Sequence, residues 1–252
     1  TSFSISLQLG NKGIKGRDVL VWQEPLHDRL TGNMQLILKS PEIRTNKILI
    51  PQNATYHRAL QLTSQDQHAS FGPLGYLYDF KVKDDIRKDA FVLTNSDQIE
   101  ALTYLVESLP DVTFRVAALT EMSASLLSMV RYPNVVLYQN ISQERIQELL
   151  KISSIYLDIN HYAEVQGIVR KAFEYQQVIL AFSHTVHDRT YLAQANIFGQ
   201  GKEADLVARI KEIYQSVDRY REAVAQQISQ SSSIDPAEFK AYLLEGIGGQ
   251  GE

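Results

Sequence analysis

The stretch FVLTNSDQIEALTYLVESLPDVTFRVAA, residues 91–118, decides the fold. It opens with a short apolar run, Phe91 to Thr94, continues with helical spacing of apolar residues over Asp97 to Leu109, and ends in a second apolar run, Thr113 to Ala118. Strand, helix and strand in this order form the unit from which parallel sheets are built. Apart from Arg115, the interiors of both strands are apolar at consecutive positions rather than alternating, which is typical of a sheet that helices cover on both faces.

The same alternation continues toward the C-terminus. The expected elements are, in order, helix 121–129, strand 135–138, helix 143–152, strand 155–159, helix 165–175 and strand 178–182. Ser96 and Ser142 stand where an N-cap side chain accepts a hydrogen bond from a free backbone N–H, so helices are expected to begin after them. Residues 202–228 predict a long amphipathic helix broken near Ser216, and Asp235-Pro236-Ala237-Glu238 opens a last helix with a capping box. The sequence therefore predicts an α/β fold with a Rossmann-like parallel sheet.

The first part of the chain carries further short elements. Apolar runs at 19–22, 34–38 and 48–50 predict three strands, and 54–62 has helical spacing. Gly72 to Gly75 indicates a turn, and the charged segment 81–88 indicates a linker. An aromatic platform for a sugar or peptide is one reading of Trp22, Tyr56, Tyr76 and Tyr78, and packing in a core or domain interface is the simpler one.

Composition narrows the class of protein. The 252 residues are 44% hydrophobic with only 7 Pro and 13 Gly, which excludes a disordered or fibrous chain. The 25 Lys and Arg against 29 Asp and Glu give a net charge of −4 without a basic run, so no nucleic-acid partner is expected. The absence of cysteine fits a reducing compartment, and no apolar stretch approaches the ~20 residues that span a bilayer. We expect a cytoplasmic protein and, because the chain starts at Thr1 rather than Met, a piece of a longer one.

Candidate site residues come from the loops that follow the strands, because an open parallel sheet binds ligands at the carboxyl ends of its strands. These loops are rich in Ser, Thr and Asn. Helix capping accounts for most such residues without any ligand, and a polar binding cleft is the functional alternative. The candidates for an acceptor or ligand cleft are Asn95, Ser96, Thr120, Glu121, Asn160, His161, Glu164 and His184.

Motifs for cofactors and metals are missing from the sequence. The pattern GxGxxG is met only at Gly246 to Gly251, after the last predicted helix rather than between a strand and a helix, and GxxxxGK[ST] does not occur. A dinucleotide dehydrogenase or a P-loop NTPase is therefore not expected, and no cofactor is predicted. His161 with Glu164 could form an acid/base pair or half a metal site, but without a third ligand at recognisable spacing we prefer a structural or acceptor-contacting role. His184 and His187 form a similar pair, for which solvation at the surface is the simpler explanation. No metal site is predicted.

Five segments carry a resemblance to a known family: VLVWQEPL from Val19, GNMQLIL from Gly32, LTNSDQIE from Leu93, ALTEMS from Ala118 and YLDINH from Tyr156. Together they resemble the GtfB family, the stabilising subunits or glycosylation chaperones of the accessory Sec glycosyltransferase of Gram-positive bacteria. The resemblance runs from about Asp18 to the last helices. The segments are specific as a set rather than singly.

The resemblance implies a GT-B architecture, in which two Rossmann-like domains face each other across a cleft. Residues 1–85 would be the back half of the N-terminal, acceptor-side domain, residues 86–216 the C-terminal Rossmann-like domain, and residues 217–252 the C-terminal helices, which can cross back to the first domain. Family members bind a catalytic partner, GtfA, which transfers N-acetylglucosamine from its UDP-sugar to serines and threonines of serine-rich repeat adhesins. The family's stabilising subunit contacts the acceptor polypeptide, and peripheral association of the complex with the inner face of the cell membrane stays open.

The charged residues of an active enzyme are missing at the positions where the fold would place them. Retaining GT-B enzymes carry an Arg and a Lys after the first strand of the second domain, because cationic donors stabilise the leaving diphosphate, yet Leu93 to Glu100 contains no cation. Such enzymes also carry two glutamates eight positions apart, and here Ala163 and Lys171 align with them. The sequence therefore predicts a non-catalytic stabilising and acceptor-binding subunit of a protein O-GlcNAc transferase. The alternative is an active retaining glycosyltransferase that uses a UDP-sugar.

Overall fold

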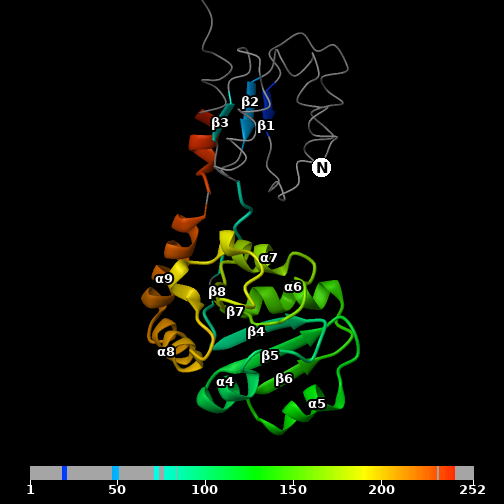
Figure 1. Ribbon diagram of the computed structural model, residues 1–252. Helices are drawn as coiled ribbons and strands as arrows, with labels where there is room; N and C mark the ends of the chain where they lie inside the picture. Colours follow the sequence, from blue (N-terminus) through cyan, green and yellow to red (C-terminus); the bar gives the residue numbers. More distant parts are fainter. Residues whose placement is uncertain are drawn as a thin grey trace, which may run out of the picture. The chain divides into compact units, whose positions relative to one another are not determined.

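The computed structural model describes residues 77–83, 85–231 and 233–241 in full, and also three short strands that precede them (Figure 1). The chain divides into two compact units, one comprising Thr1–Tyr78 and Ser232–Glu252 and the other Asp79–Ser231. Each unit contains a parallel sheet of its own. Within the described part of the chain, no helix combines the length and the apolar character needed to cross a membrane.

The first unit holds three parallel strands, β1 (Val19–Val21), β2 (Lys47–Ile50) and β3 (Phe71–Pro73), in the spatial order β1-β2-β3. Two of the expected strands coincide with β1 and β2. The turn expected at Gly72-Pro73 is wrong, because these residues pair with β2 as a strand. Among the described strands of this unit β3 stands at one end, a position where the missing N–H of a proline is tolerated. The expected strand 34–38 and helix 54–62, with Trp22, Tyr56 and Tyr76, lie outside the described residues.

The second unit is built on a six-stranded sheet whose order is β6-β5-β4-β7-β8-β9, with every pair parallel. Its strands are β4 (Asp89–Thr94), β5 (Thr113–Ala118), β6 (Val135–Tyr138), β7 (Ile155–Asp158), β8 (Val178–Phe182) and β9 (Ile197–Phe198). The chain starts in the middle of the sheet, moves outward to β6, and then returns to the other side of β4 with β7. This is the doubly wound Rossmann order, and its switch point lies between β4 and β7.

Helices cover both faces of this sheet (Figure 1). They are α4 (Leu102–Ser108), α5 (Ala124–Leu127), α6 (Gln143–Ile152), α7 (Ile168–Glu174), α8 (Glu203–Ile213) and α9 (Val217–Gln230), with single 3-10 turns at Ser128–Arg131, Arg189–Tyr191 and Gln194–Asn196. One core joins α4, α5, α8 and α9 to alternate strand residues such as Val92, Val116 and Leu157. In β4, β7 and β8 the intervening residues, including Phe91 and Tyr156, are also buried, which explains why the apolar runs of these strands are continuous. The predicted α/β fold with a Rossmann-like parallel sheet is confirmed.

Helix starts agree with the sequence at Ser142, Ser216 and Asp235. The Oγ atoms of Ser142 and Ser216 accept hydrogen bonds from the N–H groups of Arg145 and Arg219, at 3.3 and 3.2 Å. Asp235 likewise caps the helical residues 236–241 through the N–H of Ala237, at 2.8 Å. The break expected near Ser216 is therefore confirmed, with α8 ending and α9 beginning on either side of it.

The helix expected directly after Ser96 is wrong in its first turn. Helix α4 begins only at Leu102, and its N-cap Ala101 has a left-handed backbone, with φ of +54°. Ser96 instead closes a turn: its N–H donates to Thr94 Oγ1 at 3.0 Å, and its own Oγ accepts from Gln98 N at 3.2 Å. The helix expected over 121–129 is also shorter, since α5 begins after its cap Ser123. In the loop after β4, the local hydrogen bonds of Thr94 and Ser96 take the place of the first helical turn.

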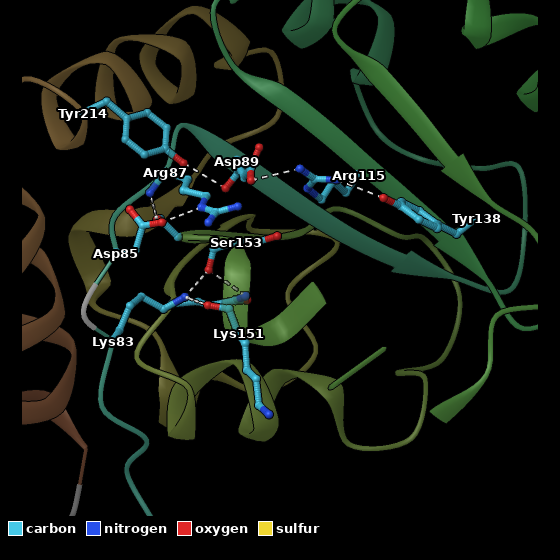
Figure 2. A network of polar contacts seen from close by, with 11 residues as sticks. Lys83, Asp85, Arg87, Asp89, Arg115, Tyr138, Lys151, Ser153 and Tyr214 are labelled. Carbon is cyan, nitrogen blue, oxygen red and sulfur yellow. Dashed lines mark hydrogen bonds and ion pairs between the residues drawn. The ribbon is translucent and has the colours of Figure 1, made fainter. Parts of the chain in front are cut away.

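The segment that enters the second unit is anchored at the amino edge of the sheet (Figure 2). Lys83 donates from Nζ to the backbone carbonyls of Leu150, at 3.4 Å, Lys151, at 2.9 Å, and Ser153. These carbonyls lie at the C-terminal end of α6, where the helix dipole favours a cation. Burial nevertheless lowers the pKa of Lys83 to about 8. The residues expected to be a linker are irregular in conformation but docked.

A second set of contacts at this edge ties the sheet to its helices. The buried Asp89 carboxylate pairs with Arg115 at 3.2 Å, and Arg115 donates on to the hydroxyl of Tyr138 at 2.9 Å (Figure 2). The Tyr214 hydroxyl, just after α8, donates to the Asp89 carbonyl at 2.9 Å. The start of β4 is thereby connected to β5, β6 and the α8 end.

Candidate functional site

The carboxyl edge of the six-stranded sheet carries the candidate residues in two groups. Asn95, Ser96, Thr120 and Glu121 follow β4 and β5, whereas Asn160, His161, Glu164 and His184 follow β7 and β8. The boundary between the groups is the switch point, where a doubly wound sheet binds its ligands.

The first group lines a cleft of about 330 Å³. The lining residues are Asn95, Ser96, Asp97, Ala118, Thr120, Glu121, Met122, Ser123 and Leu126. The structure thus brings all four candidates of this group together and adds a second carboxylate, Asp97. No Lys or Arg belongs to the described lining of this cleft, so its charge comes from Asp97 and Glu121.

A second hollow of about 370 Å³ shares two lining residues, Asp97 and Leu126, with the cleft. Its other lining residues are mainly apolar and come from α4 and the α5 region: Ile99, Ala101, Leu102, Thr103, Tyr104, Ser125 and Met129. The Tyr104 side chain is exposed there. The acidic cleft therefore continues into a more apolar depression with an aromatic residue at its wall.

Backbone hydrogen bonds span the crevice at the switch point itself. Ile99 and Asn160 form an isolated antiparallel bridge. Glu100 N donates to the Ile159 carbonyl at 2.8 Å, and His161 N donates to the Gln98 carbonyl at 3.2 Å. Because of this bridge, α4 begins only at Leu102. The bridge also places the chain's own backbone where a doubly wound fold otherwise binds a phosphate at a helix N-terminus.

Asn160 supports this bridge rather than facing a ligand. It is 3% exposed, and its Oδ1 accepts from the N–H of Tyr162 at 3.2 Å and lies 3.5 Å from the Ser96 hydroxyl. The second contact links the loops after β4 and β7. Asn160 is thus the candidate that a ligand can reach least easily, because it is the most buried of the eight.

His161 and His184 converge on Glu100, a residue that the sequence did not single out. The His161 Nε2 atom lies 2.6 Å from Glu100 Oε2, and the His184 Nε2 atom lies 3.5 Å from the same oxygen. The two imidazole rings are 5.5 Å apart between centroids. Glu100 is 61 positions from His161, so no local spacing could reveal the contact, although the expected sheet order brings the loops after β4 and β7 together.

Glu164 has a partner other than His161. Its Oε1 accepts the N–H of Val169 in the first turn of α7, at 2.8 Å, so it satisfies a free N–H at a helix start. Partial burial raises the pKa of Glu164, and the Val169 N–H opposes that rise. The hypothesis of a His161 and Glu164 pair is wrong, because each side chain is held by a different neighbour.

His187 is also not a solvated surface residue, so the simpler explanation given for the His184 and His187 pair is wrong for this member. Its Nδ1 lies 2.5 Å from Asp158 Oδ1, its backbone N–H donates to Asp158 Oδ2 at 2.8 Å, and its Nε2 contacts the Tyr162 carbonyl. The Asp158 side chain is 1% exposed. The hydrogen bond to Asp158 raises the pKa of His187 to about 9, against the opposing effect of burial. A buried carboxylate at the end of β7 explains this arrangement, because it needs a charged partner.

Comparison with known proteins identifies the family. A sequence family described as the GftB/GlyA-F C-terminal domain matches residues 90–227, and one described as the GtfB third domain matches residues 1–62. The chain belongs to the GtfB family. This confirms the resemblance drawn from the five sequence segments.

Individual relatives of this GtfB-family chain agree. The UDP-N-acetylglucosamine--peptide N-acetylglucosaminyltransferase stabilizing protein GtfB of Streptococcus pneumoniae is 49% identical over 99% of the chain and 56% of its own length. The protein of the same name from Streptococcus gordonii is 49% identical over 99% of the chain and 55% of its own length. The chain spans little more than half the length of these relatives.

A solved structure supports the fold of this GtfB-family chain. The crystal structure of a GtfA/B complex bound to UDP and GlcNAc contains a chain that is 48% identical, with a TM-score of 0.73 over 96% of this chain and 54% of that one. The GT-B-like class predicted from the sequence is confirmed by this match and by the parallel sheets of the two units.

Proposed function

We propose that this chain belongs to a non-catalytic stabilising subunit that binds a catalytic O-GlcNAc transferase subunit and a serine-rich acceptor polypeptide. Support for the partner comes from the relatives, which are named as stabilising proteins of a peptide N-acetylglucosaminyltransferase. Further support is the similar chain in a GtfA/B complex. As the family resemblance leads us to expect, the complex acts in the cytoplasm.

The observation that carries the non-catalytic part is the charge of the cleft after β4 and β5. A leaving UDP develops negative charge on its diphosphate, which an enzyme stabilises with Arg, Lys or a metal ion. The described lining of this cleft instead supplies Asp97 and Glu121 and no basic side chain. The negative charges of Asp97 and Glu121 repel a diphosphate. In addition, the backbone bridge at Ile99 and Asn160 takes the place of a phosphate-binding helix start.

The same cleft suits a hydroxyl-rich polypeptide. Carboxylates and amides accept hydrogen bonds from Ser and Thr hydroxyls and from backbone N–H groups, and bonds to a charged acceptor are stronger than neutral ones. Asp97, Glu121 and Asn95 offer such acceptors, and Thr120 and Ser123 add hydroxyls. An extended acceptor segment with small polar side chains would meet many of these groups without needing a deep pocket.

Calorimetry tests both parts on the chain itself. We expect a synthetic Ser/Thr-rich peptide to bind saturably and UDP or UDP-N-acetylglucosamine not to bind. Asp97→Asn and Glu121→Gln should each weaken peptide binding by about tenfold, since a hydrogen bond to a charged group contributes about 1.5 kcal/mol or more. Asp111→Asn, an exposed carboxylate before β5 at the opposite edge, is the matched control and should bind like the wild type.

The alternative is an active retaining glycosyltransferase that uses a UDP-sugar. It requires saturable binding of UDP and hydrolysis of UDP-N-acetylglucosamine by the isolated chain. Either result would remove the non-catalytic proposal. Co-expression with a catalytic subunit tests the stabilising role separately, because co-purification and a raised thermal midpoint of that subunit do not depend on the cleft.

A further inference from the structure

Three metal-ligating side chains meet at the carboxyl edge of the sheet, beside the proposed acceptor cleft. One oxygen of Glu100 and one ring nitrogen each of His161 and His184 all lie within 4.8 Å of one another. Two imidazoles and one carboxylate are a ligand set that zinc uses when it leaves a coordination position open. We propose that Glu100, His161 and His184 bind a zinc ion.

The distances suit such an ion with small adjustments. Zinc bonds of about 2.0–2.2 Å in tetrahedral geometry set ligand atoms about 3.4 Å apart. Glu100 Oε2 and His184 Nε2 are already 3.5 Å apart. Glu100 Oε2 and His161 Nε2 are 2.6 Å apart, the length of a hydrogen bond, so this pair has to open by less than 1 Å as the metal replaces the shared proton.

Backbone hydrogen bonds preorganise all three ligands. Glu100 and His161 face each other across the antiparallel bridge, which is closed by the hydrogen bonds from Glu100 N to the Ile159 carbonyl and from His161 N to the Gln98 carbonyl. His184 lies two residues beyond the end of β8, and its ring stacks on that of Phe182 with centroids 5.8 Å apart. A binding site whose ligands sit on anchored segments loses little conformational freedom when the ion arrives.

His184 is held from its other side as well. The next residue, Thr185, is buried and donates from Oγ1 to the Asp158 carbonyl at the end of β7, at 2.8 Å. The preceding Ser183 donates its N–H to the Phe198 carbonyl at 2.7 Å. These two hydrogen bonds hold His184 in place relative to the loop after β7, which carries His161.

Charge and access also favour a cation. Glu100 brings a carboxylate oxygen against the ring nitrogens of two imidazoles, and all three are atoms that coordinate zinc. The side chains of Glu100, His161 and His184 are 24%, 33% and 29% exposed, so an ion can enter from solvent. A bound zinc would join the loops after β4, β7 and β8, next to the cleft that Asp97 and Glu121 line.

The site requires neither the catalytic subunit nor the acceptor, so the chain alone is sufficient for the test. The tag-free chain is stripped with a chelator, dialysed and titrated with zinc chloride by calorimetry. We expect one ion per chain with micromolar or tighter affinity. His161→Gln, His184→Gln and Glu100→Gln should each weaken binding by at least about tenfold.

His68→Gln, which lies outside the described residues, is the control for other histidines and should keep the wild-type affinity. Circular dichroism of the metal-free variants separates loss of a ligand from loss of the fold. X-ray absorption at the zinc edge of the wild-type protein gives a measurement that needs no variant, and we expect two imidazole ligands. No saturable binding, equal affinity in every variant, or a zinc environment without two imidazoles would overturn the proposal.

Discussion

The pair formed by His187 and the buried Asp158 makes the stability of the protein depend on pH in a defined direction. The Asp158 hydrogen bond raises the pKa of His187 from its ordinary value of 6.5 to about 9. Because the folded-state value is the higher one, the folded protein holds the proton more tightly than the unfolded chain. The stabilisation is complete below pH 6.5 and is lost as the pH rises through about 9.

The size of the effect follows from the same two values. At about 1.4 kcal/mol for each pH unit, the difference between 6.5 and about 9 corresponds to about 3 kcal/mol at most. The His187 side chain is only 14% exposed, so solvent screens the pair weakly. His187→Gln should therefore destabilise the protein by about 3 kcal/mol near pH 6.5, where the wild type carries the full charge pair, and by less near pH 9.5.

Urea unfolding at several pH values between 6 and 9.5, in the presence of a chelator, measures this effect. Lys83 titrates in the same window with the opposite sign, since burial lowers its pKa to about 8 and the charged form is the one penalised. The informative quantity is therefore the difference in unfolding free energy between wild type and His187→Gln at each pH. His184→Gln leaves the pair with Asp158 intact and serves as the control. A difference that stays constant across the window would refute the assignment of the charge pair.

Substitutions at three further residues test the packing and capping of the second unit. Phe173→Ala removes a fully buried ring that lies 5.2 Å from two other aromatic rings, and we expect a loss of about 3–5 kcal/mol in urea unfolding. Gln227→Leu deprives the buried Ile179 N–H and the Gln177 carbonyl, just before β8, of their partners, each at 2.9 Å. About 2–4 kcal/mol should be lost and the Ile179 amide should exchange faster, whereas Gln227→Glu keeps the acceptor for that amide. Ser216→Ala should cost about 1 kcal/mol and Ser216→Asp almost nothing, and equal losses would contradict the cap.

Much of the fold could be predicted because the strands of a doubly wound sheet are apolar at consecutive positions. The runs at 135–138 and 178–182 match β6 and β8 at both ends, and the helix at 143–152 matches α6, whose cap Ser142 is a local signal. Helix α4 was predicted less well. Asp97 to Glu100 has helical spacing, but the bridge between Ile99 and Asn160 wins, and a pairing between residues so far apart in sequence leaves no local pattern.

The sequence identifies the loops that form the candidate site, but it does not identify the contacts between their side chains. Asn95, Ser96, Thr120 and Glu121 were selected only because they follow β4 and β5, and that was enough to find the residues of one cleft. Two sets of contacts could not be predicted, those of Glu100 with the two histidines and that of Asp158 with His187. Their contacts depend on how loops after different strands turn toward one another, and neither hydrophobic periodicity nor residue spacing reports the direction of a loop.

The anchoring of residues 83–89 has a consequence for how this fold can change over time. Lys83, Arg115 and Tyr214 act at the amino edge, whereas the cleft and the imidazole cluster lie at the carboxyl edge. Strand β4 has six residues, so about 16 Å separates its two ends. Free-energy effects of substitutions at that separation generally add independently. The loops at the carboxyl edge can therefore diverge among relatives while the contacts of residues 83–89 stay the same.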